Sequence, residues 1–278
     1  MADKETVGII GVGRMGLAMC KHMLRNGYDV YARDIDLNQL AEAAKAGATV
    51  VDTPAELGER ATFVIVIPVT DEQVNEVLLG PNGLIETVLP GTVVAVSSTV
   101  SPYAVQALDE KFHAKGADML DAPLCRGRDY ADAGTLLALV GGKPDVVERG
   151  RAVYRTFCSD IAHLGEVGHG QVGKAMNNML LWINSIGLIE AGRLAATTGI
   201  DLPTLRDALQ MSSGKSQALE DWDQTTFTFA LKDMQIVSQM ADKAGLSMPF
   251  AGAAREMVKD AKRLKASPDA PAWTGKKA

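Results

Sequence analysis

Hydrophobic and polar positions follow two alternating periods over the first 160 or so residues. Short runs such as "TVGII" (6–10), "TFVIVIP" (62–68) and "GTVVAVSS" (91–98) are almost wholly apolar, as in strands that are covered on both faces. Stretches with helical spacing lie between them. This repeated alternation predicts an α/β fold with a mainly parallel, doubly wound sheet. Further strands are expected within 28–34, 117–123, 135–142 and 160–165, and a further helix over 144–157.

Several helix ends in this part carry local signals. Gly27 is placed to end the first helix, which begins near residue 14. Thr53 precedes Pro54, and Ser101 precedes Pro102. Because a hydroxyl at the cap and proline at the first helical position both favour a helix start, helices are expected from 54 and from 102.

The pattern changes after Gly168. The sequence has helical spacing from Gln171 to about Thr198, and again to the C-terminal tail, with breaks at Gly199, 212–214 and Gly245. One helix of this length would span roughly 40 Å, which is longer than a small domain is wide. We therefore expect an α/β domain over residues 1–163 and a helical domain over 164–278, joined through the long helix.

A glycine-rich turn follows the first predicted strand. It matches the pattern GxGxxG, opens a helix, and has an acidic residue, Asp34, 18 positions after its last glycine. The first glycine allows a tight turn, the second a close approach of pyrophosphate, and the third close packing of helix and strand. This context predicts a dinucleotide site, and the alternative is a βα turn without a ligand. The candidate cofactor residues of the turn are Gly11, Val12, Gly13, Arg14, Met15 and Gly16.

Asp34 bears on the choice of cofactor. A carboxylate at the end of the second strand accepts hydrogen bonds from the adenosine ribose and repels a 2′-phosphate, so it favours NAD. The adjacent Arg33 leaves NADP open, because its guanidinium can bind a phosphate. The simpler interpretation of Asp34 is that it caps a turn.

Lys174 and Asn178 are one helical turn apart near the start of the long helix. The helix dipole disfavours the charged form of a lysine at that end, which makes Lys174 a candidate for proton transfer. On spacing alone, an ordinary surface lysine is the alternative.

Charge and composition exclude several classes of function. A net charge of −6 and a pI near 5.3 argue against nucleic-acid binding. The three cysteines form no CxxC pair and the four histidines show no ligand spacing, so neither disulfides nor a metal site is expected. The segment "MADKETVGII" lacks the apolar core of a secretory signal. The most apolar run, "MLLWINSIGLI", has 11 residues, where a membrane span needs about 20. A cytoplasmic protein without membrane contact is predicted.

Four segments resemble the signature regions of the β-hydroxyacid dehydrogenase family, which includes 3-hydroxyisobutyrate dehydrogenase and tartronate semialdehyde reductase. They are "VGIIGVGRMGLAMCKHML", "DAPLCRG", "GHGQVGKAMNNML" and "LKDMQIVSQMADKAGLSMP", in the family's order. The resemblance implies a Rossmann domain followed by an all-helical domain like that of 6-phosphogluconate dehydrogenase. It also implies NAD(P)-dependent oxidation of a small anionic β-hydroxy acid, or reduction of its semialdehyde. Subunits of such enzymes pair through their helical domains, so a homodimer or homotetramer is expected.

The resemblance also implies roles for individual residues. Lys174 falls on the family's catalytic lysine, which accepts the hydroxyl proton while hydride leaves the same carbon, and no metal is needed. Asn178 and Asn177 fall on its paired asparagines. Lys232 matches the lysine that closes over the nicotinamide. Thr99 matches a residue that contacts the cofactor near the nicotinamide, and Pro68 is also expected to bind the cofactor. The expected substrate residues are Asp121, Pro123, Cys125, Arg126, Gly127 and Asn177.

One segment departs from the family. "DAPLCRGRD" (121–129), predicted as a strand-end loop, has Cys125-Arg126-Gly127 where many members have Ser-Gly-Gly. A thiol donates hydrogen bonds poorly, whereas the fork of Arg126 suits a carboxylate, sulfonate or phosphate. A branch similar to 3-sulfolactaldehyde reductase has Gly-Arg-Thr here, with its arginine aligned on Arg126, but Gly127 replaces the threonine. The alternative is that Arg126 points to solvent or makes a structural ion pair.

Other functions stay open at this point. They are an NADP(H)-dependent semialdehyde or sulfonate-aldehyde reductase of the same family, an imine reductase, and a dinucleotide-binding protein without turnover. Imine reductases of this kind usually lack the lysine, so Lys174 argues against that class.

Overall fold

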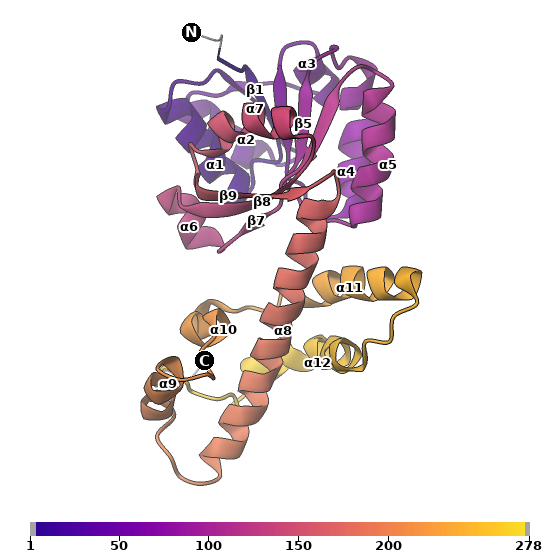
Figure 1. Ribbon diagram of the computed structural model, residues 1–278. Coiled ribbons are helices and arrows are strands. Elements are labelled where there is room, and N and C mark those ends of the chain that lie inside the picture. The colour runs from indigo at the N-terminus through magenta and orange to yellow at the C-terminus, as the bar shows by residue number, and fades with distance from the viewer. Residues whose placement is uncertain (1–3, 276–278) are drawn as a thin grey trace. The chain divides into compact units, whose positions relative to one another are not determined.

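The computed structural model describes residues 4–275, and the chain folds into two compact units (Figure 1). The first ends at Lys174 and the second begins at Ala175, within one helix. The sequence places the boundary at 163/164. The contacts place it later, because the first turns of that helix bond to the α/β unit: the Gln171 side chain donates to Ser98 O at 2.8 Å.

The first unit is built on a nine-stranded sheet with the order β3-β2-β1-β4-β5-β6-β8-β7, in which β9 also pairs with β8. The six strands from β3 to β6 run parallel, which confirms the doubly wound α/β prediction. β8 runs antiparallel to β6 and β7, and β9 runs parallel to β8. The strands are β1 (Val7–Ile10), β2 (Val30–Arg33), β3 (Thr49–Val50), β4 (Phe63–Val66), β5 (Val93–Val96), β6 (Asp118–Asp121), β7 (Leu124–Cys125), β8 (Leu136–Gly141) and β9 (Cys158–Gly165).

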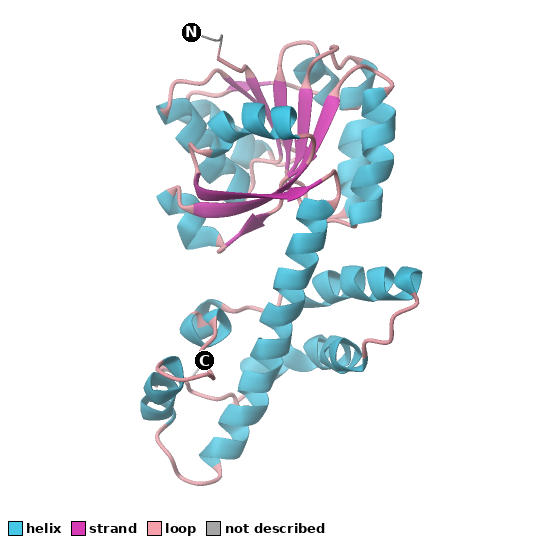
Figure 2. Ribbon diagram, in the orientation of Figure 1, coloured by secondary structure: helices cyan, strands magenta, loops and turns pink. Residues whose placement is uncertain are grey.

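Helices cover both faces of this sheet (Figure 2). Ile9 packs in one apolar cluster with Met19 of α1, and Ile10 packs in the other with Leu108 of α5. Since successive strand residues point to opposite faces, a sheet covered on both sides requires the continuous apolar runs seen in the sequence. The helices are α1 (Arg14–Arg25), α2 (Leu37–Ala46), α3 (Pro54–Gly58), α4 (Asp71–Leu79), η1 (Leu84–Glu86), α5 (Pro102–His113), α6 (Arg128–Ala133) and α7 (Pro144–Tyr154).

The segment expected as a simple loop, 121–129, is partly regular. Leu124 and Cys125 form β7, paired with Ala138 and Leu137 of β8, and α6 begins at Arg128. The pattern missed β7 because two residues are too few to show a period of two.

The predicted helix starts are confirmed. Thr53 Oγ1 accepts from Glu56 N at 3.3 Å at the start of α3, with Pro54 in the first turn. α5 begins at Pro102, after Ser101.

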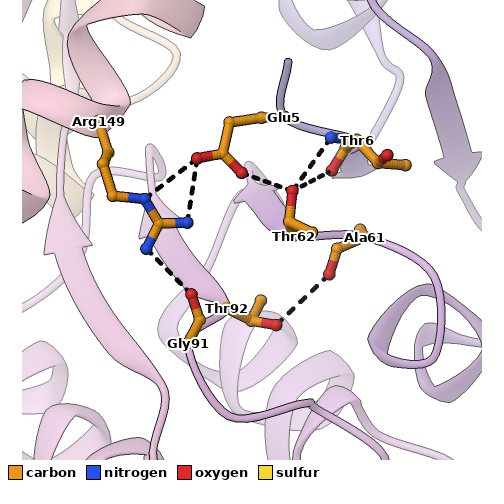
Figure 3. A network of polar contacts seen from close by, with 7 residues as sticks. All are labelled: Glu5, Thr6, Ala61, Thr62, Gly91, Thr92 and Arg149. Atoms are coloured by element: carbon orange, nitrogen blue, oxygen red, sulfur yellow. Dashed lines mark hydrogen bonds and ion pairs between the residues drawn. The ribbon is translucent and has the colours of Figure 1, made fainter. Parts of the chain in front are cut away.

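A polar network ties the segment before β1 to three other parts of the unit (Figure 3). Glu5 pairs with Arg149 of α7 at 3.0 Å and accepts from the hydroxyl of Thr62, which precedes β4. Arg149 also donates to Gly91 O at 3.0 Å, next to β5. Thr6 N donates to Thr62 Oγ1 at 3.0 Å. These contacts hold the amino ends of neighbouring strands together.

The second unit is helical, as predicted. Its core includes Trp182, Trp222 and Trp273, each at most 7% exposed. Gly199 and Gly245 take positive φ at helix ends. The helices are α8 (His169–Ala196), α9 (Leu202–Gln210), α10 (Gln217–Glu220), η2 (Trp222–Gln224), α11 (Ala230–Ala244) and α12 (Pro249–Lys265).

α8 has 28 residues, as expected for the long helix. Among residues 4–275 it is the one helix long and apolar enough to cross a membrane, with a mean hydropathy of 1.2 in its best window, a third of which is buried. A core helix of a soluble protein meets the same criteria. The absence of a membrane span therefore stays a prediction.

Candidate active site

The glycine turn between β1 and α1 has the geometry of a phosphate-binding turn. Gly11 has φ +100, and a Cβ there would lie 3.0 Å from Ile67 O. A Cβ on Gly16 would lie 1.9 Å from Gly11 O, so that position has no room for a side chain. By contrast, nothing lies within 4 Å of a Cβ on Gly13. The turn is thus closely packed at its first and third glycines and open at its second, where a pyrophosphate needs access.

The amino end of α1 suits an anion. Its N-cap is Gly13, no side-chain hydrogen bond caps it, and its first turn carries no acidic residue. The first N–H groups of a helix have no partner within the helix, and the dipole favours negative charge there. The described residues therefore leave this helix end suited to a phosphate.

Asp34 follows β2 directly. Its carboxylate accepts from Val12 N at 2.6 Å and from Asp36 N at 2.9 Å, which is the turn-capping geometry anticipated as the simpler interpretation. A carboxylate has about four acceptor positions, so these two bonds leave capacity for ribose hydroxyls. Arg33 is the last residue of β2 and is half-buried.

Arg14 joins the glycine turn to α6. Its guanidinium pairs with Asp132 at 2.8 Å, and both side chains are more than half exposed. His22 lies 3.1 Å from the Asp132 carbonyl oxygen. An exposed pair of this kind contributes little stability, so a phosphate group can compete with Asp132 for Arg14.

The carboxyl end of β5 carries Thr99, which is half-buried. The Gln171 side chain bonds to the residues on both sides of Thr99. It donates to Ser98 O at 2.8 Å and accepts from Val100 N at 3.1 Å. The Ser98 hydroxyl donates to Pro68 O at 2.6 Å. Pro68 and Thr99 therefore lie in adjoining segments after β4 and β5, at the edge of the sheet where the glycine turn also lies.

Asp121, expected to contact substrate, is completely buried. Its carboxylate accepts from Gly168 N at 2.7 Å and from Gln171 N at 2.6 Å. Burial raises the pKa of this carboxyl, and the backbone donors oppose that effect. These bonds hold the beginning of α8, the helix that carries Lys174, against the end of β6.

Lys174 lies in the second turn of α8 and is partly buried. Its Nζ donates to Leu124 O at 2.7 Å and lies 3.7 Å from Cys125 Sγ. Both acceptors belong to β7. The fold therefore brings Lys174 against the segment 121–129, which the sequence analysis assigned to the same site. Cys125 is 5% exposed.

Arg126 has φ +84 and the next residue, Gly127, φ +91. Positive φ costs a residue with a side chain of the order of 1–3 kcal/mol. The guanidinium donates to Thr135 O and Ser159 Oγ, each at 2.8 Å, and pairs with Asp160 at 2.7 Å. The structural ion pair weighed as the alternative is therefore present.

The other residues of the predicted substrate loop differ in accessibility. Pro123 is buried, and its carbonyl accepts from Leu139 N at 3.1 Å. Gly127 is exposed, with open space where a side chain would be. The loop thus changes from core to surface between Cys125 and Gly127.

Asn177 and Asn178 belong to the second unit. Asn178 Nδ2 donates to Asp233 Oδ2 at 2.9 Å, and Asn177 Nδ2 donates to Asn178 Oδ1 at 3.0 Å. Trp182 Nε1 also donates to Asp233 Oδ2, at 3.0 Å. Asp233 and Trp182 are missing from the predicted site. The spacing of Asn178 and Trp182, one turn apart, was a signal, but their shared acceptor lies on α11.

Lys232 is the residue before Asp233 in α11 and is half-buried. No group of three or more histidines, cysteines or acidic residues within the described part of the chain is arranged to hold a metal ion.

Comparison with known proteins identifies two matching domains. Residues 6–179 match the NAD binding domain of 6-phosphogluconate dehydrogenase. Residues 168–272 match the NAD-binding domain of NADP-dependent 3-hydroxyisobutyrate dehydrogenase. The chain belongs to the β-hydroxyacid dehydrogenase family. It therefore has the NAD-binding domain of this family, as predicted from the glycine turn.

Relatives of this chain include the mitochondrial 3-hydroxyisobutyrate dehydrogenase of Mus musculus. The two are 35% identical over 215 residues, which is 77% of this chain and 64% of the mouse protein. The chain thus spans less than two thirds of that relative. L-threonate dehydrogenase of Cupriavidus necator is 30% identical over 264 residues, which is 91% of this chain and 89% of that protein.

A solved structure with a similar fold is 3-hydroxyisobutyrate dehydrogenase from Salmonella typhimurium. It is 25% identical, with a TM-score of 0.81, and the match covers 97% of this chain and 96% of that one.

Proposed function

We propose that this family member transfers hydride between a nicotinamide cofactor and the hydroxyl-bearing carbon of a small anionic β-hydroxy acid, in either direction. The observation that carries the proposal is the position of Lys174. Its amine meets the β7 segment in the same unit that holds the open glycine turn. A proton-transfer group and a dinucleotide turn are the two components that such a reaction needs.

Lys174 acts as the general acid/base in this proposal. The bound nicotinamide supplies the hydride acceptor. A neutral amine that donates to Leu124 O still has its lone pair, with which it accepts the substrate's hydroxyl proton. In the reverse direction its ammonium returns a proton to the forming alkoxide. Proton transfer of this kind contributes typically about 10²–10⁴-fold to the rate.

We assign the glycine turn to the pyrophosphate and Asp34 to the adenosine ribose, with NAD preferred over NADP. The carboxylate supports this preference because it repels a 2′-phosphate. Arg33 beside it keeps NADP as the alternative. Pro68, Thr99 and Lys232 are assigned to the nicotinamide end by the family resemblance.

Asn178 holds the substrate hydroxyl in this proposal, with Asn177 beside it. The bonds to Asp233 and Asn177 support a defined orientation of the Asn178 amide, with its nitrogen toward Asp233. Restricting the amide in this way reduces the entropy lost when substrate binds.

The loop from Pro123 to Gly127 is assigned to the substrate anion. Arg126, expected to bind that anion directly, already donates to three protein acceptors. This occupancy favours an indirect contribution of Arg126, through the position of the loop. A sulfonate remains a candidate anion beside a carboxylate, because both accept hydrogen bonds from the same donors.

A substrate panel tests the function. Purified protein is mixed with NAD or NADP and with carboxylate and sulfonate β-hydroxy acids, and the absorbance of the reduced nicotinamide is followed. We expect turnover with at least one acid, and a fall of about 10²–10⁴-fold in kcat for Lys174→Ala. Lys45→Ala, on the exposed face of α2, serves as the matched control. Full turnover in Lys174→Ala would show the mechanism to be wrong, and cofactor binding without any turnover would favour the non-catalytic alternative.

We also propose a homodimer or homotetramer assembled through the second unit. Leu180 and Leu194 of α8 are 56% and 71% exposed. They are four helical turns apart on one face, with Gly187 midway between them and open space around it. Asn184, also exposed, interrupts this otherwise apolar face, and exposed leucines of this kind support contact with another subunit.

A further inference from the structure

The Arg126 backbone needs support from its surroundings. A residue with a side chain rarely holds a φ of +84 unless other contacts impose it. Here the contacts include those of the guanidinium, beside the pairing of Cys125 with Leu137 of β8. The guanidinium donates to Thr135 O and Ser159 Oγ at 2.8 Å and pairs with Asp160 at 2.7 Å.

The three acceptors are themselves connected. Ser159 Oγ donates to Asp160 Oδ2 at 2.8 Å and lies 3.3 Å from Thr135 O. Thr135 immediately precedes β8, whereas Ser159 and Asp160 belong to β9. The hydrogen bonds from Ser159 and Arg126 lower the pKa of the Asp160 carboxyl. We call this group, Arg126 with Thr135, Ser159 and Asp160, the β9 clamp.

The β9 clamp lies next to the lysine's acceptor. Leu124, two residues before Arg126, presents the carbonyl that accepts from Lys174 Nζ at 2.7 Å. Cys125 lies between them, with Sγ 3.7 Å from the same amine. Leu124 and Cys125 are also paired with Ala138 and Leu137 of β8, so movement of the Arg126 backbone would reach this carbonyl by loosening the end of a two-residue ladder.

We propose that Asp160, assisted by Ser159, is a positioning residue: it holds Arg126, and through it the Leu124 carbonyl in the place that orients Lys174. In this arrangement Arg126 acts on the reaction through the loop and is not itself the ligand of the substrate anion. The catalytic consequence rests on the proposed function, while the clamp itself does not.

If Arg126 binds the substrate anion directly, the change Asp160→Asn should affect the kinetics differently. If Arg126 bound the substrate anion, removing the charge of Asp160 would release the guanidinium and lower the KM for the acid. If the β9 clamp positions the loop, the same change loosens the loop and lowers kcat.

The test compares Asp160→Asn, Arg126→Ala and the double variant in the full chain. Hydrogen–deuterium exchange of the peptide covering residues 122–131 reports on the loop, and steady-state kinetics report on the reaction. We expect Asp160→Asn to speed exchange there at least tenfold and to lower kcat at least tenfold. The KM for the cofactor should stay within twofold. The kcat of the double variant should be less than twofold below that of Arg126→Ala, because both changes open the same clamp.

Glu148→Gln is the matched control. It removes the pairing of Glu148 with Arg151 on α7, another surface ion pair of this unit, and should change neither measurement. Unchanged exchange in Asp160→Asn, or a lower KM for the acid at unchanged kcat, would overturn the proposal. If the unmodified protein turned over no acid, the proposed function would fail, and the exchange measurement alone would then decide the clamp.

Discussion

At the scale of single residues, Asp34 shows how one carboxylate can serve two purposes. It holds the glycine turn through Val12 N, and in the proposed function it also accepts hydrogen bonds from the adenosine ribose. Neutralising it while keeping an oxygen acceptor separates these purposes.

Asp34→Asn should shift the preference from NAD toward NADP at least tenfold, because a 2′-phosphate no longer meets a negative charge. The ratio of kcat/KM for the two cofactors measures this shift. Asp36→Asn is the control, since Asp36 caps α2 through Asn38 N in the same turn. If the ratio of kcat/KM for NAD and NADP were unchanged in Asp34→Asn, Asp34 would not determine the cofactor preference.

The thiols give a second prediction at this scale. Burial raises the pKa of Cys20 to about 11 and that of Cys158 to about 12. The thiolate is the reactive form, so at pH 8 roughly one Cys20 in 10³ is reactive.

Alkylation of these two cysteines by iodoacetamide should therefore be slow in the native protein at pH 8, and should quicken about tenfold per pH unit toward pH 11. Peptide mass spectrometry measures the modification site by site. In denaturant both thiols should react promptly, since their ordinary pKa is restored. Rapid labelling of the native protein at neutral pH would contradict the burial of these groups.

At the scale of elements, the βα turn and the start of α8 supply most of the candidate site. The turn provides a matched pair of glycines, since a Cβ on Gly16 would lie 1.9 Å from Gly11 O whereas one on Gly13 would meet nothing within 4 Å.

Gly16→Ala should lower the free energy of unfolding by about 1–3 kcal/mol or more, because the turn must open to admit the methyl group. Gly13→Ala should leave the thermal midpoint unchanged but weaken NAD binding at least tenfold, because the methyl group occupies the space that the pyrophosphate needs. Calorimetry and cofactor titration measure the two effects. Native cofactor affinity in Gly13→Ala would contradict the phosphate assignment.

At the scale of the whole molecule, the apolar face of α8 bears on assembly. Light scattering after gel filtration should give a mass of at least twice 29.5 kDa. The double change Leu180→Asp and Leu194→Asp should reduce that mass, because charges on both ends of the face oppose burial. Lys262→Glu on α12 is the control. A monomeric unmodified protein would show the assembly proposal to be wrong.

Much of the fold could be predicted from the sequence. Strands β1, β4 and β5 are continuous apolar runs, and the long helix is 28 residues uninterrupted by proline. The antiparallel pairing of β7 with β8 could not be predicted, since a two-residue strand shows no period. Apolar runs and helical spacing can be read within one short window of the chain. An element without such a pattern becomes visible only in three dimensions.

The sequence by itself determined the doubly wound architecture, the dinucleotide turn and the candidacy of Lys174, because periodicity, glycine spacing and helix position are local properties. Only the tertiary structure decided what the polar side chains do with their hydrogen bonds. Asp121 binds the start of α8, and Arg126 binds Asp160 of β9. The physical reason is that a buried or strained polar group takes whichever partners the fold brings within about 3 Å, and those partners are distant in the chain.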